Sequence, residues 1–299
     1  MSSLNGIFAP LATPFAANGE IDTVAFAFNI RAHLDAGLAG VVIAGSTGEA
    51  ALLDESERSS LVEVAREILP KGKTLIVGAG AESTRYAIRL AKNAAARGAD
   101  AVLVVAPHYY SASMTSEVLL RHYRAVADAS PIPVILYNIP KYMHFAIPAN
   151  VVSELARHPN IIGIKDSSGN REMIAGFAEA KSPTFSLLSG SGAMLQYAMS
   201  LGATGGILGV SLFAPSLALE VFSAMKRGDT AAATHAQEQV APLHMKIVAE
   251  LGVPGVKAAL DQVGLKGGPL RPPLAALGAN ERAEVAGLIR SAQLQPLSR

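Results

Sequence analysis

Eight short runs of apolar, largely β-branched residues recur along the chain, and a segment with helical spacing of its apolar residues follows each run. The runs show no alternation of polar and apolar positions, which is typical of strands buried on both faces. Successive runs begin roughly 20 to 35 residues apart, enough for a strand and a returning helix. This pattern predicts an α/β protein built as a (β/α)8 TIM barrel. The runs are Gly6 to Ala12, Gly40 to Ala44, Thr74 to Val77, Ala101 to Val105, Pro133 to Tyr137, Ile161 to Lys165, Phe185 to Ser189 and Gly206 to Val210.

A doubly wound parallel sheet is the alternative fold for the same alternation of strands and helices. Its dinucleotide-binding fingerprint, GxGxxG directly after the first strand, is missing. Signals for helix starts agree with the spacing, since Asp54 opens a capping-box pattern and Ser83 or Thr84 precedes the next helical segment. Pro148 falls where a first helical residue is expected.

The barrel is expected to end near Met225, which predicts a catalytic barrel over residues 1–225 and a helical extension over residues 226–299. Neither a Ser/Gly-rich linker nor an internal repeat separates the two parts. We therefore expect the extension to pack on the barrel. Helical patterns in the extension cover Ala231 to Leu251, Val256 to Val263 and Asn280 to Leu294.

Charge and residue types exclude several classes of protein. The 25 Lys and Arg residues balance 24 Asp and Glu residues without a basic block, which argues against a nucleic-acid partner. Cysteine is absent, and the 7 histidines form no HxH or HExxH pair, so neither a thiolate nor a metal site is expected. Glycines and a proline interrupt the uncharged stretch Ser182 to Leu219, which argues against a membrane span. No signal peptide is visible, and a cytoplasmic protein is expected.

In such barrels the functional side chains lie at the carboxyl ends of the strands. Gly190 lies where barrels often bind phosphate, although its glycine pair also suits a tight turn, and no GxxxxGK[ST] loop exists. We place Gly190 and Ile207, near the ends of the last two strands, among the substrate-binding residues. The candidates at the strand ends are Gly45 to Glu49, Pro107 to Tyr110, Tyr137-Asn138, Lys165-Asp166 and Gly190 to Gly192.

Lys165 is the most informative of these residues. It ends a strand with no other polar side chain before it, so its amine is expected to point into a confined place. Burial disfavours the charged form of an amine, and an uncharged amine can attack a ketone and form a Schiff base. The alternative is a lysine that extends to solvent or pairs with Asp166.

Two further groups could act with this lysine. Tyr137 ends the neighbouring strand, and its hydroxyl could relay protons beside an imine, although an aromatic residue also closes the top of a core. Ser46 and Thr47 offer hydroxyls and amides suited to a carboxylate, although such glycine-flanked turns also occur for their geometry alone. Glu49 could equally cap, pair or act.

These residues resemble a known family. The chain is similar to the pyruvate-utilising class I aldolases of the dihydrodipicolinate synthase and N-acetylneuraminate lyase family over nearly its whole length, from Gly6 to Arg271-Pro272-Pro273. The motifs that carry the resemblance are Gly45-Ser46-Thr47-Gly48-Glu49, Tyr137-Asn138-Ile139-Pro140 and Gly163-Ile164-Lys165-Asp166-Ser167-Ser168-Gly169.

The resemblance implies a role for each matched residue. The Schiff-base lysine of the family falls on Lys165 and its proton-relaying tyrosine on Tyr137. Its hydroxyl pair near the pyruvate carboxylate falls on Ser46 and Thr47, with Gly48 beside them. A second tyrosine, lent by a neighbouring subunit in several members, falls on Tyr109. The resemblance further implies a 2-oxo acid substrate such as pyruvate, no cofactor or metal, and a homotetramer built as a dimer of dimers.

The preferred activity is cleavage of 4-hydroxy-2-oxoglutarate to pyruvate and glyoxylate, because the stretches around Val126 to Pro133 and Gly252 to Lys257 are similar to aldolases of that specificity. Alternatives are 4-hydroxy-tetrahydrodipicolinate synthase, which joins pyruvate to aspartate semialdehyde, and a sugar-acid aldolase or dehydratase. A non-catalytic barrel that binds 2-oxo acids is a further alternative.

Four positions are expected to set specificity: Lys141, Tyr142, Ser167 and Ser168. The synthases carry an arginine shortly after the Tyr-Asn-x-Pro motif, and its place is taken here by Tyr142. Lys141 could supply a charge instead.

Overall fold

Eight parallel strands close into a barrel in chain order, β1 to β8, in the computed structural model, which describes residues 4–297. Every strand residue except three is buried, which agrees with the absence of alternation in the sequence. The predicted barrel is confirmed. The strands are β1 Gly6–Pro10, β2 Gly40–Ile43, β3 Thr74–Gly78, β4 Ala101–Val105, β5 Val134–Asn138, β6 Ile161–Asp166, β7 Ser186–Ser189 and β8 Gly205–Ile207.

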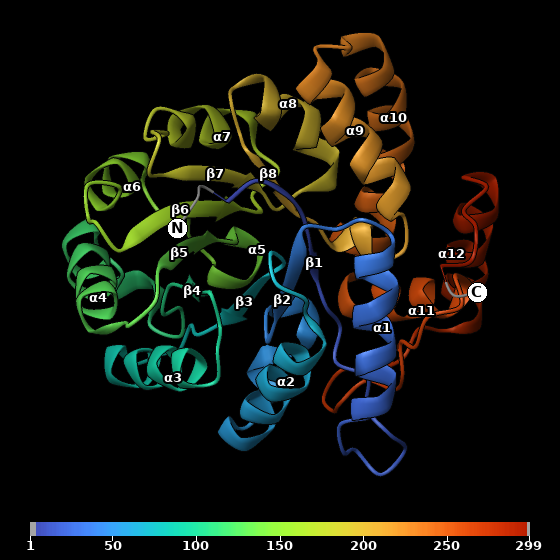
Figure 1. Ribbon diagram of the computed structural model, residues 1–299, viewed down its shortest axis with the longest axis horizontal. Coiled ribbons are helices and arrows are strands. Elements are labelled where there is room, and N and C mark those ends of the chain that lie inside the picture. The colour runs from blue at the N-terminus through green and yellow to red at the C-terminus, as the bar shows by residue number, and fades with distance from the viewer. Residues whose placement is uncertain (1–3, 298–299) are drawn as a thin grey trace.

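Helices surround the strands, and the last two helices, α11 and α12, lie to one side of this ring (Figure 1). Short 3-10 turns, among them Ser46–Gly48 and Gly209–Leu212, follow several strands. The helices are α1 Thr23–Asp35, α2 Glu55–Ile68, α3 Thr84–Ala96, α4 Ser116–Ala129, α5 Pro140–Met143, α6 Ala149–Leu155, α7 Arg171–Ala178, α8 Leu195–Ser200, α9 Pro215–Arg227, α10 Thr230–Leu243, α11 Gly252–Gln262 and α12 Ala279–Ser291, with a π-helix at His244–Glu250.

Local signals correctly predict the starts of α2 and α3. Asp54 caps α2 through a complete capping box with Glu57, and the Ser83 side chain caps α3. Pro148 is the N-cap of α6 rather than its first residue, because its ψ of 143° is extended although its φ of −62° suits either position.

Several predicted elements are shorter than expected, among them the last strand and one C-terminal helix. The last strand ends at Ile207, because the chain turns into the 3-10 helix Gly209–Leu212. The helix predicted over Ala231 to Leu251 divides into α10 and the π-helix. This change follows Pro242, whose nitrogen has no hydrogen to donate to the helix.

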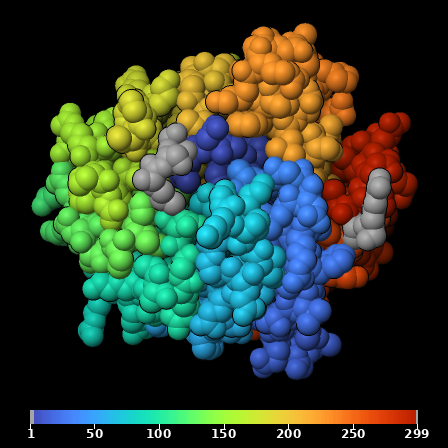
Figure 2. Space-filling view, viewed as in Figure 1, coloured from blue at the N-terminus to red at the C-terminus, as the bar shows by residue number. Residues whose placement is uncertain are grey.

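The C-terminal helices contact the barrel at several places. Helix α10 packs against α9, and α11 contacts the Ser46–Gly48 turn after β2. In the space-filling view the orange residues of the C-terminal third form one continuous surface with the yellow residues that precede them (Figure 2). The division into residues 1–225 and 226–299 stays a prediction, and residues 1–3 and 298–299 of it lie outside the described residues.

Two buried histidines predict how the stability of the fold depends on pH. Burial lowers the pKa of His122 and of His244 to about 4, whereas an unfolded histidine titrates near about 6.5. Both side chains are therefore neutral in the folded protein, and the unfolded chain binds more protons below about pH 6.5. The free energy of unfolding should fall as the pH drops from about 6.5 to about 4, by on the order of 3 kcal/mol for each histidine.

Urea unfolding at pH 7, 5.5 and 4.5 checks this expectation. His244→Gln should unfold with a smaller loss of stability between pH 7 and 4.5 than the original chain, whereas His235→Gln, at an exposed position, should not. Equal losses in His244→Gln and in the original chain would contradict the prediction.

Candidate active site

Lys165 and Tyr137 lie side by side at the carboxyl end of the barrel. They are register partners on β6 and β5, and each side chain is about nineteen-twentieths buried, with 5% and 4% exposure. The Lys165 Nζ lies 4.2 Å from the centre of the Tyr137 ring. Because the two residues face each other across adjacent strands, the tyrosine ring fixes one side of the space around the amine.

The amine of Lys165 forms no ion pair or hydrogen bond among residues 4–297. It therefore neither reaches solvent nor pairs with Asp166, as the alternative interpretation required. A buried amine without a carboxylate beside it is free to react with a carbonyl group, whereas an amine held in a salt bridge is not.

The neighbouring residues Asn138 and Asp166 point the other way, as alternation along a strand demands. The Asn138 amide donates to Asp166 Oδ1 over 2.7 Å and accepts from the Ile147 amide over 3.0 Å. Ser168 donates its hydroxyl to Asp166 Oδ2 over 2.7 Å. Burial raises the pKa of Asp166, and the hydrogen bonds from Asn138 and Ser168 oppose this shift. These side chains fix the loops after β5 and β6 from outside the barrel.

The Ser46–Gly48 turn presents donors at the end of β2. The amides and hydroxyls of Ser46 and Thr47 have no acceptor among residues 4–297. The Gly48 carbonyl accepts from the Thr13 hydroxyl over 2.7 Å, and a Cβ at Gly48 would lie 2.9 Å from the Leu11 carbonyl oxygen. The turn is therefore packed closely against the loop after β1, with four free donors available for an anion.

Glu49, directly after this turn, is paired. Its carboxylate is fully buried and lies 2.5 Å from the Lys257 Nζ, and its other oxygen accepts from the Arg271 amide over 3.0 Å. In the sequence analysis Lys257 and Arg271 appear only within stretches that carry the family resemblance. Nothing local in α11 marks Lys257 as buried, so the contact with Glu49 could not be predicted.

Tyr109 lies apart from the buried lysine and tyrosine. It is 78% exposed in the loop after β4, and its ring packs edge-on against Tyr110. Glu82 fixes this loop by accepting from the amides of His108 and Tyr109 over 3.0 and 2.9 Å. The single chain thus leaves Tyr109 on its surface.

The remaining predicted substrate-binding residues, Gly190 and Ile207, and the predicted specificity residues Ser167 and Ser168 lie at or directly after the ends of β6, β7 and β8. Gly190 abuts the Ser167 hydroxyl, so a side chain at residue 190 would collide with it. Ile207 is fully buried at the end of β8. Ser168 is occupied by its hydrogen bond to Asp166, which makes it a support of the loop.

Lys141 and Tyr142, on the short helix α5, differ in their surroundings. The Lys141 Nζ donates to the Ala249 carbonyl over 2.6 Å, which ties it to the C-terminal π-helix. Burial, and to a smaller extent the nearby Tyr137, raises the pKa of the Tyr142 hydroxyl. Tyr142 therefore stays a neutral hydrogen-bond donor at physiological pH.

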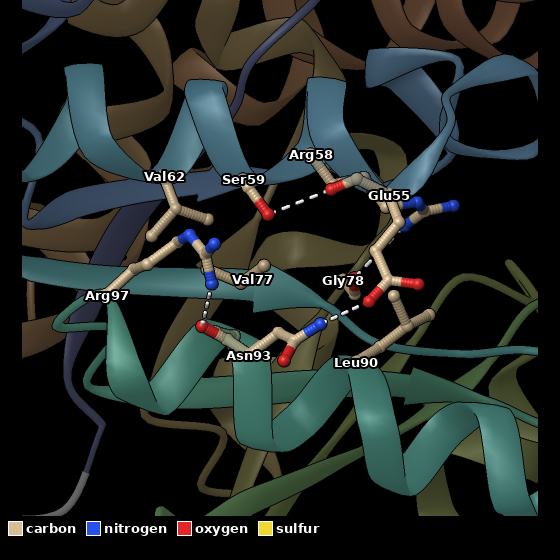
Figure 3. Close-up of a pocket in the computed structure, with 10 residues that line it drawn as sticks. Glu55, Arg58, Ser59, Val62, Val77, Gly78, Leu90, Asn93 and Arg97 are labelled. Carbon is tan, nitrogen blue, oxygen red and sulfur yellow. Dashed lines mark hydrogen bonds between the residues drawn. The ribbon is translucent and has the colours of Figure 1, made fainter.

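A separate cleft lies between α2 and α3 on the outside of the barrel (Figure 3). Its polar side chains already bind one another: Asn93 donates to Glu55, Arg97 donates to the Asn93 carbonyl over 3.3 Å, and Ser59 donates to the Glu55 carbonyl over 2.8 Å. The buried Arg58 Nε at this cleft has no partner among the described residues, but neither Lys165 nor Tyr137 lines the cleft. We therefore do not assign the chemistry to it.

Residues 4–297 contain no cluster of three or more His, Asp or Glu side chains placed to hold a metal ion. Within the same range, no helix has the length and apolar character needed to cross a membrane.

Comparison with known proteins decides the family. The model of the dihydrodipicolinate synthetase family matches residues 3–292. The chain belongs to this family. A 4-hydroxy-tetrahydrodipicolinate synthase from Acidiphilium cryptum is 36% identical over 281 residues, which cover 94% of this chain and 96% of the relative.

Solved structures of this family superpose closely on the chain. The chloride-inhibited dihydrodipicolinate synthase from Acinetobacter baumannii, complexed with pyruvate, has a TM-score of 0.93 and 31% identity, covering 98% of this chain and 100% of that one. A monomeric dihydrodipicolinate synthase variant has a TM-score of 0.92 and 27% identity, with 97% of each chain covered. The protein is thus an enzyme, a lyase of the class I aldolase type, for which a Schiff-base lysine is characteristic.

Proposed function

We propose that this lyase forms an imine between Lys165 and pyruvate and makes or breaks the carbon–carbon bond next to that imine. The observation that carries the proposal is the buried Lys165 amine, without an ion pair, 4.2 Å from the centre of the Tyr137 ring. No other group in the site is needed as an electron sink, so the reaction requires no added cofactor.

The first steps follow from this arrangement. The Lys165 nitrogen attacks the ketone carbon of pyruvate; the nitrogen then loses one proton while the former carbonyl oxygen takes one, which gives the hydroxyl of the carbinolamine. A second proton converts that hydroxyl to water, which leaves as the protonated imine forms. The Tyr137 hydroxyl delivers and removes these protons. The free amides and hydroxyls of Ser46 and Thr47 hold the pyruvate carboxylate.

For the second substrate the relatives favour aspartate semialdehyde, which makes the chain a 4-hydroxy-tetrahydrodipicolinate synthase. The relatives reported above carry the name of this synthase, which the sequence analysis gave as an alternative, and not that of the preferred 4-hydroxy-2-oxoglutarate aldolase. One observation favours the latter as a second candidate. Tyr142, a neutral donor, stands where the synthases carry an arginine.

Assays with the two candidate substrates separate the possibilities. Pyruvate consumption should be faster with aspartate semialdehyde than pyruvate release from 4-hydroxy-2-oxoglutarate, compared as kcat/KM. In Tyr142→Arg the new charge should raise kcat/KM for aspartate semialdehyde by about tenfold, because a charged hydrogen bond to a carboxylate is worth roughly 1.5 kcal/mol or more. If kcat/KM for aspartate semialdehyde, relative to kcat/KM for 4-hydroxy-2-oxoglutarate, is unchanged in Tyr142→Arg, then residue 142 does not contact the substrate carboxylate.

Activity on neither substrate, with imine formation intact, would point to a sugar acid.

The functional unit that we propose is a homotetramer, in which the exposed Tyr109 of one chain lies at the site of another. One relative is a monomeric variant, so the oligomeric state of this protein should be measured by sedimentation in solution.

A further inference from the structure

We propose that Glu49, Lys257 and Arg271 form a clamp that aligns the Ser46–Gly48 turn for the carboxylate of pyruvate. This inference rests on the proposed function and adds positioning residues to it. The clamp joins the turn after the second strand to a segment more than 200 residues later in the chain.

Glu49 carries two energetic costs at one residue. Its backbone has a φ of 58° and a ψ of 36°, a left-handed conformation that costs a residue other than glycine on the order of 1 kcal/mol. Its carboxylate is fully buried, with 0% of the side chain exposed, beside a Lys257 side chain that is 3% exposed. Such strain persists only where the surroundings impose it, and it gathers at functional sites.

The contacts of the clamp fix Glu49 from two sides. Lys257 holds one carboxylate oxygen as an ion pair, and its Nζ also donates to the Pro269 carbonyl over 2.7 Å. The Arg271 amide holds the other oxygen. The Arg271 guanidinium in turn binds both oxygens of Glu57, over 2.6 and 2.7 Å, and the Leu52 carbonyl over 2.8 Å.

Stability alone does not account for a buried pair of this kind. Desolvation of two charges cancels most of their attraction, and well-packed apolar replacements are often neutral or stabilising. Burial lowers the pKa of Lys257, and Glu49 opposes that shift, as expected for a pair that persists because each charge compensates the other. What the pair adds is a fixed geometry at the residue that follows the turn.

Geometry matters here because the cations that contact residues next to the turn are already occupied: the Arg58 guanidinium donates to the Ala50 and Gly78 carbonyls. Glu49 and Glu57 neutralise Lys257 and Arg271. The carboxylate of the substrate is therefore bound by the neutral amides and hydroxyls of Ser46 and Thr47 alone. Neutral hydrogen bonds weaken steeply when misaligned, so a shift of the turn lowers pyruvate affinity more than it lowers the reactivity of Lys165.

Trapping of the imine with borohydride at a series of pyruvate concentrations tests the clamp. The double variant Glu49→Gln/Lys257→Met removes both charges at similar volume, and the Lys246→Met variant removes a lysine paired with Glu250 and Glu284 elsewhere. We expect the pyruvate concentration at half-maximal trapping to rise at least tenfold in the double variant, with the maximal trapping rate within threefold of the original. Lys246→Met should leave both values unchanged.

A folded double variant with unchanged half-maximal pyruvate would overturn the clamp and make the pair purely structural. If the double variant does not fold, Glu57→Gln decides, because it loosens Arg271 without opening the buried pair. We expect a three- to tenfold rise in half-maximal pyruvate in that variant, and no rise would also overturn the proposal. Absence of any adduct in the original chain would instead contradict the proposed function, so the two failures are distinct.

Discussion

Replacing Lys165 with alanine should abolish the pyruvate adduct and lower lyase turnover by on the order of 10⁴-fold or more. The reason is that, among residues 4–297, no other amine lies buried beside Tyr137: Lys257 is bound to Glu49, and Lys141 to the Ala249 carbonyl. Incubation with pyruvate and borohydride, followed by intact mass and peptide mapping, measures the loss directly.

The control for this experiment is Lys226→Ala, which removes an exposed lysine and should keep the full adduct. A mass gain that persists in Lys165→Ala, or that maps to Lys141, would show that the site assignment is wrong. Alanine leaves no buried charge behind, so the fold should survive and the loss can be read as chemistry.

Replacing Tyr137 with phenylalanine should lower turnover by roughly 10²- to 10⁴-fold while the protein still forms the adduct slowly. The ring stays beneath the Lys165 amine, 4.2 Å from its nitrogen, so the variant removes the proton relay and keeps the lysine in place. The time course of mass gain under borohydride separates a slow imine from an absent one.

Tyr123→Phe is the matched control for the loss of a buried tyrosine hydroxyl. The Tyr123 hydroxyl donates to the Val104 carbonyl over 3.3 Å, away from the lysine, and its loss should cost about 1 kcal/mol of stability without slowing the reaction. Adduct formation in Tyr137→Phe as fast as in the original chain would exclude the hydroxyl from the proton transfers.

The barrel and the lysine–tyrosine pair could be predicted because both depend on local pattern. Strands buried on both faces lack alternation, and consecutive strands of a barrel are neighbours, so residues at the ends of the fifth and sixth strands must meet. Tyr137 and Lys165 are indeed register partners. The same reasoning could not tell that Tyr137 and Lys165 face the barrel interior whereas the next residues, Asn138 and Asp166, face outward. The direction of each side chain depends on where the alternation along the strand stands at its end.

The contacts that support the Ser46–Gly48 turn could not be predicted in this way. Lys257 lies on a helix whose spacing shows an ordinary amphipathic segment, and Arg271 lies in a Pro-rich stretch without periodicity. Their meeting with Glu49 depends on how the C-terminal segment returns across the barrel, which no local signal encodes. The exact start of α6 could not be predicted either, because the fixed φ of Pro148 suits both an N-cap and a first helical residue.

The contacts of the C-terminal segment with Glu49 can form only late in the synthesis of the protein. Glu49 and Arg271 are 222 residues apart, so a ribosome that adds 5 to 20 residues per second makes the second roughly 10 to 45 s after the first. Once residue 207 has been made, the nascent chain contains all eight strands and Lys165, whereas Lys257 and Arg271, the partners of Glu49, are still to be added. The growing polypeptide thus contains the proposed nucleophile before the contacts that fix the Ser46–Gly48 turn.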